Sequence, residues 1–154
     1  GEAAAGVVSL APALLALRAG DTAAYHGVEH KAIAAYERDD DAADAAKEHD
    51  RCGSNLVAPM LAANVAGAAL LRRAVEHPGP VANAAVAVGA VAVAVEVFGW
   101  AERHAGTRLA RALRRPGYEL QRHMGTREPT PEQLEVGRAA LAEIVRAERP
   151  PGRG

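Results

Sequence analysis

The chain alternates long apolar stretches with short polar interruptions. The two longest apolar stretches cover residues 55–71 and 81–101, and the residues between them include two arginines, two prolines and a glycine. Because such a break turns one helix back on another, the pattern predicts a helical hairpin. Each stretch approaches the roughly 20 residues that a helix needs to cross a bilayer.

The residues within the hairpin are compatible with two environments. Alanine and glycine supply little transfer free energy, and Asn55, Asn64, Asn83 and Glu96 lower it further. The hairpin is therefore expected to be either membrane-associated or the buried core of a soluble protein or of an oligomer.

Shorter segments precede the hairpin. The pattern predicts an apolar helix over residues 6–18, and a second helix that begins at Asp21 or Thr22, either of which could cap it, and ends near Glu37. An acidic run then leads into a short helix expected over about residues 42–49.

Two further helices are expected after the hairpin. The first carries several arginines and should stop at Pro116. The second starts at Thr130, with Pro131 in its first position and Gln133 in capping-box spacing. Its predicted core stripe consists of Leu134, Leu141, Ile144 and Val145.

Composition favours helices throughout. Alanine is abundant and aromatic residues make up 3% of the chain, whereas strands favour aromatic and β-branched side chains. We therefore predict an all-α fold of about five or six helices. Residues 1–149 should form one helical domain, and residues 150–154 a disordered tail.

Charge and cysteine content narrow the function classes. A net charge of −1 gives no general electrostatic reason to bind nucleic acid, so no nucleic-acid partner is expected. A single cysteine excludes an internal disulfide and a paired-cysteine redox motif.

The run from His26 to His30 reads His-Gly-Val-Glu-His. On a helix, His26 and His30 share a face and could hold one Zn²⁺, while Glu29 beside them could act as a general base toward water. The same residues could also form an ordinary polar patch on a helix.

Two further positions are candidate ligands. His49 and Cys52 are three residues apart, and imidazole nitrogen and thiolate sulfur both suit zinc. Alternatively, Cys52 is a small buried hydrophobe and His49 a helix-end residue. Glu96 is a carboxylate within an apolar stretch, so it needs a metal, a proton or an arginine partner unless it is exposed.

These residues belong to a series of motifs that resembles the YqhQ-like bacterial family, domain of unknown function 1385. The matching segments, in order, are Tyr25-His26-Gly27-Val28-Glu29-His30-Lys31, Tyr36-Glu37, His49-Asp50-Arg51-Cys52-Gly53-Ser54, Pro116-Gly117-Tyr118-Glu119-Leu120-Gln121-Arg122 and Thr126-Arg127-Glu128-Pro129. The resemblance implies a predicted metal-dependent enzyme, usually longer and multi-pass in the membrane. The chain departs from the pattern at Asp50, where proline is usual, at Ser54, where threonine is usual, and in the few residues before Tyr25.

The sequence thus predicts a zinc-dependent enzyme with hydrolase-type chemistry. His26 and His30 would bind the metal, and His49, Cys52 or Glu96 would complete the site. The expected substrate is a small molecule or lipid-like, and the hairpin could support a homo-oligomer. A bacterial membrane location with the motif face in the cytoplasm is expected, or a cytoplasmic one if the hairpin is a soluble core. The alternative function is a helical membrane scaffold or interaction protein in which these residues are structural.

Overall fold

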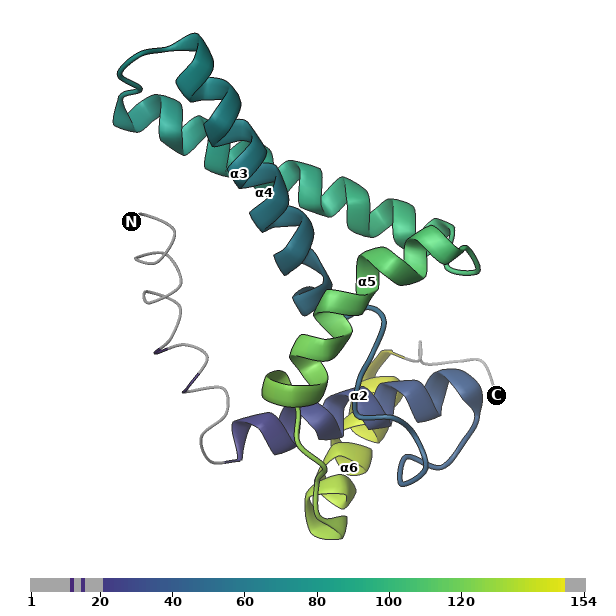
Figure 1. The fold of residues 1–154 in the computed structure, drawn as a ribbon. Helices are drawn as coiled ribbons and strands as arrows, with labels where there is room; N and C mark the ends of the chain where they lie inside the picture. Colours follow the sequence, from purple (N-terminus) through teal and green to yellow (C-terminus); the bar gives the residue numbers. More distant parts are fainter. Residues whose placement is uncertain (1–11, 13–14, 16–20, 149–154) are drawn as a thin grey trace. The chain divides into compact units, whose positions relative to one another are not determined.

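The computed structural model describes residues 12, 15 and 21–148, and this described part is helical and contains no strand (Figure 1). The all-α prediction is confirmed. The expected helix over residues 6–18 and the tail at 150–154 lie outside the continuously described chain. The continuously described residues form two compact units: residues 21–49 together with 121–148, and residues 50–120.

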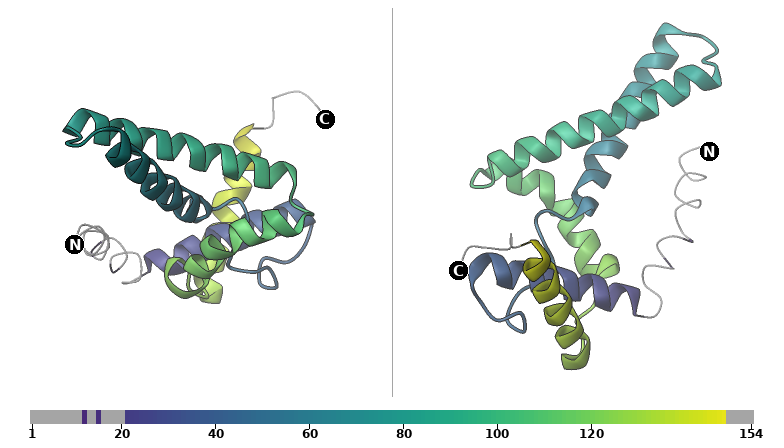
Figure 2. Two further views of the ribbon diagram at one scale, coloured as in Figure 1. Left: turned by 45° about the horizontal axis from the view of Figure 1, so that its top comes forward. Right: turned by 180° about the vertical axis from the view of Figure 1, so that it is seen from behind.

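The first unit contains α2 (Thr22–Arg38), the π-helix η2 (Gln121–Gly125) and α6 (Pro131–Glu148). Helix α2 packs on α6, and the same arrangement is visible from other directions in Figure 2. Their approach is close, because a Cβ added at Gly137 would lie 2.1 Å from Cγ1 of the buried Val28. Small side chains fill most of the remaining interior, so the core of this unit is built on alanine.

Helix α2 starts where the sequence predicts, and it ends one residue after the predicted Glu37. Asp21 is its N-cap residue, but its side chain does not cap the helix and instead accepts hydrogen bonds from Arg127 and Gln133. The helix ends at Asp39, which adopts a left-handed conformation with φ of 54°.

The helix predicted over residues 42–49 is wrong, since this segment consists of turns and bends. Asp41 Oδ1 accepts a hydrogen bond from the Ala43 N–H at 2.7 Å. Such a local side-chain bond competes with helical hydrogen bonding. At the other end of the segment, the backbone of His49 bonds to Gln121 instead of continuing a helix.

The second unit contains the 3₁₀ turn η1 (Gly53–Leu56), α3 (Val57–Ala74), α4 (Pro80–Arg103) and α5 (Arg108–Leu120). Helices α3 and α4 form the predicted hairpin. They come close where a Cβ on Gly67 would lie 2.8 Å from Val86 Cγ1.

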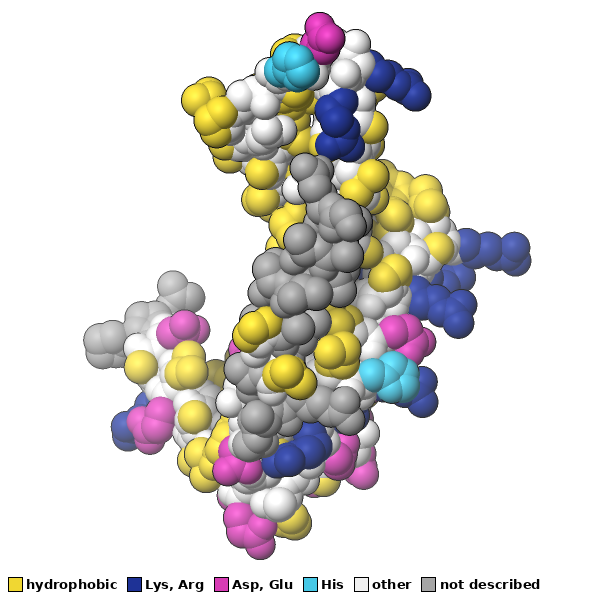
Figure 3. Space-filling model, turned by 60° about the vertical axis from the view of Figure 1, so that its left-hand side comes forward, with side chains coloured by type: hydrophobic (Ala, Val, Ile, Leu, Met, Phe, Trp, Pro, Cys, Tyr) yellow, Lys and Arg dark blue, Asp and Glu magenta, His cyan; other side chains and the backbone are white. Residues whose placement is uncertain are grey.

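The hairpin carries its apolar residues on the outside. The segments Gly53–Ala74 and Pro80–Arg103 are long and apolar enough to cross a membrane, yet only 6% and 11% of their apolar windows are buried. In the upper part of Figure 3, hydrophobic side chains lie on the surface of the chain. The described residues therefore leave most of the hairpin exposed, and its two apolar helices weakly allow membrane association.

Helix α5 does not stop at Pro116 as predicted, but continues to Leu120. A proline within a helix removes one hydrogen bond and costs about 3 kcal/mol. Packing on η1 offsets this cost: Ser54 Oγ donates to the Gly117 carbonyl at 3.2 Å, and Gly117 lies against Asn55 so closely that no Cβ would fit.

The predicted start of α6 is confirmed. Gln133 N–H donates to Thr130 Oγ1 at 3.3 Å, and Thr130 N–H donates to Gln133 Oε1 at 3.0 Å, which completes a capping box. The predicted core stripe is only partly right, because Leu134 is buried but Ile144 is 54% exposed.

Candidate metal centre

Helix α2 places His26 and His30 on one face of the first unit. Their ring centroids are 4.3 Å apart, with the rings at 61° to each other. His30 is buried and His26 is half-buried. The spacing of four residues thus brings two imidazoles together, as the sequence predicts.

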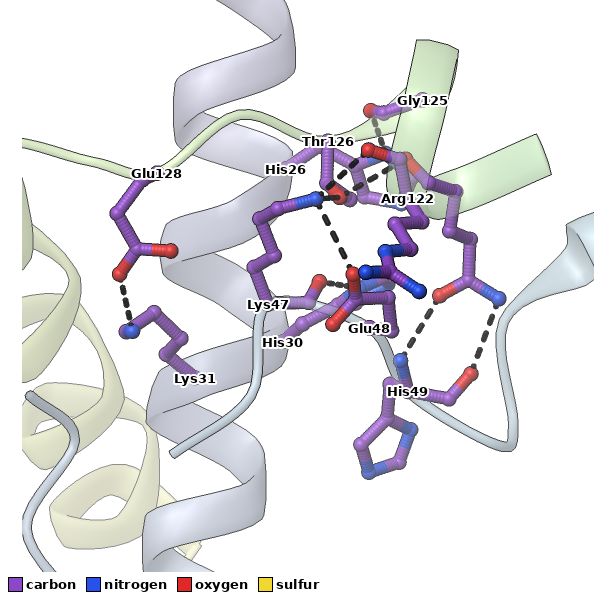
Figure 4. A network of polar contacts seen from close by, with 11 residues as sticks. His26, His30, Lys31, Lys47, Glu48, His49, Arg122, Gly125, Thr126 and Glu128 are labelled. Carbon is purple, nitrogen blue, oxygen red and sulfur yellow. Dashed lines mark hydrogen bonds and ion pairs between the residues drawn. The ribbon is translucent and has the colours of Figure 1, made fainter. Parts of the chain in front are cut away.

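Both imidazoles are held by backbone carbonyls. Nδ1 of His26 lies 2.8 Å from the Gly125 oxygen, and Nδ1 of His30 lies 2.7 Å from the Lys47 oxygen (Figure 4). A carbonyl oxygen only accepts, so each Nδ1 carries the proton and donates it. In the neutral form of each ring, Nε2 is then the nitrogen with a lone pair, and metal-ligating histidines adopt this tautomer when their other nitrogen is fixed in this way.

The two carbonyls are themselves fixed by a polar network (Figure 4). Lys47 Nζ donates to the Arg122 carbonyl at 2.9 Å and to Thr126 Oγ1 at 3.2 Å. Thr126 Oγ1 in turn donates to the Gln121 carbonyl at 3.0 Å. The network joins the loop after α2 to the π-helix η2, and π-turns of this kind are frequent at functional sites.

His49 is the third histidine of this unit. Its ring centroid lies 5.8 Å from that of His30, and its Nε2 lies 3.5 Å from the Glu37 carboxylate. Gln121 holds its backbone on both sides: Oε1 accepts from the His49 N–H at 2.8 Å, and Nε2 donates to the His49 carbonyl at 3.2 Å. The amide of Gln121 is almost fully buried.

The remaining candidate residues belong to other parts of the chain or to another face of α2. Glu29 is an exposed residue of α2, projecting about 60° from His26 and about 100° from His30 around the helix axis. Cys52 and Glu96 belong to the second unit. Cys52 is half-buried at the start of η1, and Glu96 is exposed on α4.

Four supporting residues were missed by the sequence analysis as parts of the site. Gln121, Lys47 and Thr126 build the network described above, and Lys31 is buried beside the motif, where it pairs with Glu128. Only a motif context could have drawn attention to them, because their partners lie as many as 97 residues away in the chain.

A groove also opens between α2 and α6 in the first unit, with a volume of about 740 Å³. Its walls include Ala32, Ala35 and Val145, and Asp41 and Arg138 lie among its polar residues. The backbone N–H of Ala43, together with the charge of Arg138, lowers the pKa of Asp41 below its usual value. The two histidines of the motif are not among the residues that line this groove.

Comparison with known proteins identifies a family. No curated protein and no solved structure matches the chain. A family model described as a protein of unknown function, DUF1385, matches residues 20–147. This span includes residues of both units and every motif on which the resemblance was based. The chain therefore belongs to the DUF1385 family.

Proposed function

We propose that the chain is a metal-dependent enzyme of hydrolase type, with a Zn²⁺-like ion on Nε2 of His26 and His30. The observation that carries this proposal is the pair of Nδ1–carbonyl hydrogen bonds, of 2.8 and 2.7 Å. They set both neighbouring imidazoles in the tautomer that ligates metal, and they orient both rings. A structural polar patch would not require the same tautomer twice.

Cys52 is our preferred third ligand. His49 is a weaker candidate, because its Nε2 atom already faces the carboxylate of Glu37. Cys52 follows His49 by three residues in the chain. Because only three peptide units separate them, the Cα atoms of His49 and Cys52 lie within about 11 Å of each other. The backbone of His49 is held by Gln121, so the short segment that leads to Cys52 starts from a held position. His49 and Glu96 are the alternative ligands.

The proposed reaction needs a metal-bound water and a general base. When bound, the metal would supply a Lewis acid and a water whose pKa falls to about 7. Glu29, next to His30 on the same helix, would be the general base that takes a proton from such a water. The reaction is hydrolysis of an amide or ester, or another reaction at a polarised carbonyl.

The hairpin bears on substrate and location. Its apolar side chains are exposed along both helices, which suits a lipid-like substrate that enters from a bilayer. Arginines are more numerous where α4 ends and α5 begins than at the turn between α3 and α4. A hairpin that spans a bacterial membrane would therefore have this arginine-rich end in the cytoplasm.

A helical membrane scaffold is the second candidate. The observation that favours it is the same exposed hairpin, which could bind other membrane helices or a second copy of the chain. In a scaffold, the histidine network would only stabilise the first unit. Glu29 distinguishes the two functions, because it is exposed and no hydrogen bond or ion pair of it is seen in residues 21–148.

The test is metal content after purification of the full chain, measured for the parent and for His26→Ala, His30→Ala and Cys52→Ser. We expect a stoichiometric divalent metal in the parent and its loss in all three variants. His77→Ala is the matched control, since His77 is exposed on the turn between α3 and α4, and it should keep the metal. A parent chain without stoichiometric metal would contradict the proposal.

Glu29→Gln completes this test. The enzyme should keep its metal and lose hydrolysis of a chromogenic ester, whereas a scaffold would show no metal-dependent hydrolysis in either chain. If Cys52→Ser keeps the metal and His49→Ala loses it, the third ligand is His49 and not Cys52.

A further inference from the structure

Helix α5 is fixed to the end of the hairpin by a buried arginine. Arg114 is 9% exposed and donates to the Ala101 carbonyl, near the C-terminus of α4, at 2.7 Å. The same guanidinium lies 2.6 Å from the carboxylate of Glu102 and 3.5 Å from that of Asp50. These bonds hold one face of α5 against the hairpin.

The same face of α5 also meets the start of α3. Ser54 Oγ donates to the Gly117 carbonyl, and Gly117 packs directly on Asn55 in η1. In an antiparallel hairpin, the first residues of α3 and the last residues of α4 lie at one end. Helix α5 therefore lies across that end, next to where both candidate membrane spans terminate.

Another face of α5 is basic and exposed. Arg108, Arg111 and Arg115 follow one another at spacings of three and four residues, so they form one stripe along the helix. Within residues 21–148, no ion pair involves any of the three. Leu109, which is 57% exposed, projects about 100° or more around the helix axis from each of the three arginines.

We propose that this stripe of α5, consisting of Arg108, Arg111 and Arg115, binds the phosphate headgroups of anionic lipids at the membrane surface. Guanidinium groups pair with phosphate through two parallel hydrogen bonds, and basic residues next to a span are attracted to anionic leaflets.

Trp100 supports the same placement. It stacks on His104 in the last turn of α4, with ring centroids 4.6 Å apart. Tryptophan is enriched where a span leaves the hydrocarbon, and the neighbouring arginines lie just beyond this level. This inference rests on the membrane location proposed above and is independent of the metal site.

The only tryptophan of the chain makes the proposal measurable. The full chain is reconstituted in mixed vesicles of phosphatidylcholine and phosphatidylglycerol, and Trp100 fluorescence is quenched by a brominated form of one lipid or the other. At equal mole fraction, brominated phosphatidylglycerol should quench more strongly, with a relative binding constant of roughly tenfold or more for three arginines. About 0.5 M salt should reduce this preference.

Substitution of all three arginines in the stripe by glutamine should bring the ratio close to one. The matched control replaces three exposed arginines outside α5 and outside the hairpin by glutamine, namely Arg38, Arg127 and Arg146, and it should keep the preference. Equal quenching by both lipids in the parent would overturn headgroup binding. No quenching by either lipid would overturn the membrane placement itself, so the two failures are distinguishable.

Discussion

Gly27, between the two histidines, brings their partners into place. A Cβ at this position would lie 2.5 Å from the Arg127 carbonyl oxygen, and the Arg127 N–H donates to the Ala23 carbonyl at 2.8 Å. The chain after η2 thus runs directly against α2, and it carries the Gly125 carbonyl to His26. Only glycine leaves room for backbone to lie on backbone at this point.

Gly27→Ala should therefore destabilise the first unit. Overpacking of this kind costs about 1–3 kcal/mol, and it opposes a gain of about 1 kcal/mol from the helix propensity of alanine. The expected net result is a lower thermal unfolding temperature by circular dichroism, together with weaker metal binding. Gly89→Ala in α4 is the control, because nothing lies within 4 Å of its added Cβ. An unchanged unfolding temperature in Gly27→Ala would show that the Arg127 segment moves away without cost.

At the scale of helices, local signals predicted more than distant ones. The capping box of α6 lies within four consecutive residues, and both of its hydrogen bonds form as expected. The tautomers of His26 and His30 depend instead on carbonyls 99 and 17 residues away. The spacing of the motif predicts that the two imidazole rings lie together, but it does not predict which carbonyls hold them.

The loop before the second unit is another segment whose conformation the local sequence does not predict. Its composition favours a helix, but the backbone of His49 is bound to Gln121, 72 residues away, and Lys47 is bound to η2. Tertiary hydrogen bonds therefore override local propensity there. In α5, packing of Gly117 on Asn55 similarly outweighs the stop signal of Pro116.

The capping box provides a prediction at this scale. Thr130→Ala removes the acceptor of the Gln133 N–H and should lower the free energy of unfolding by about 1 kcal/mol. Gln133→Glu is the conservative control, because glutamate keeps the reciprocal acceptor for the Thr130 N–H. Chemical denaturation followed by helical circular dichroism measures both. A loss of the same size in Gln133→Glu would argue against the capping mechanism.

For the whole molecule, the main question is whether the hairpin crosses a bilayer. Both helices are long enough, and their apolar side chains are exposed. The turn between them and the turn after α4 mark opposite ends of α4, which spans 24 residues. At 1.5 Å per residue, α4 is about 36 Å long, more than the roughly 30 Å of a hydrocarbon core. A spanning hairpin must place these two turns on opposite sides of the membrane.

Labelling of single introduced cysteines can determine this topology, because Cys52 is the only native cysteine. In a Cys52→Ser background, His77→Cys marks the turn between α3 and α4, and Gly106→Cys marks the turn after α4, where an added Cβ meets nothing within 4 Å. If the arginine-rich end is cytoplasmic, a membrane-impermeant thiol reagent should label His77→Cys in intact cells. It should label Gly106→Cys only after the cells are permeabilised. Labelling of both variants only after permeabilisation would mean that the hairpin does not cross, and the reverse pattern would invert the proposed orientation.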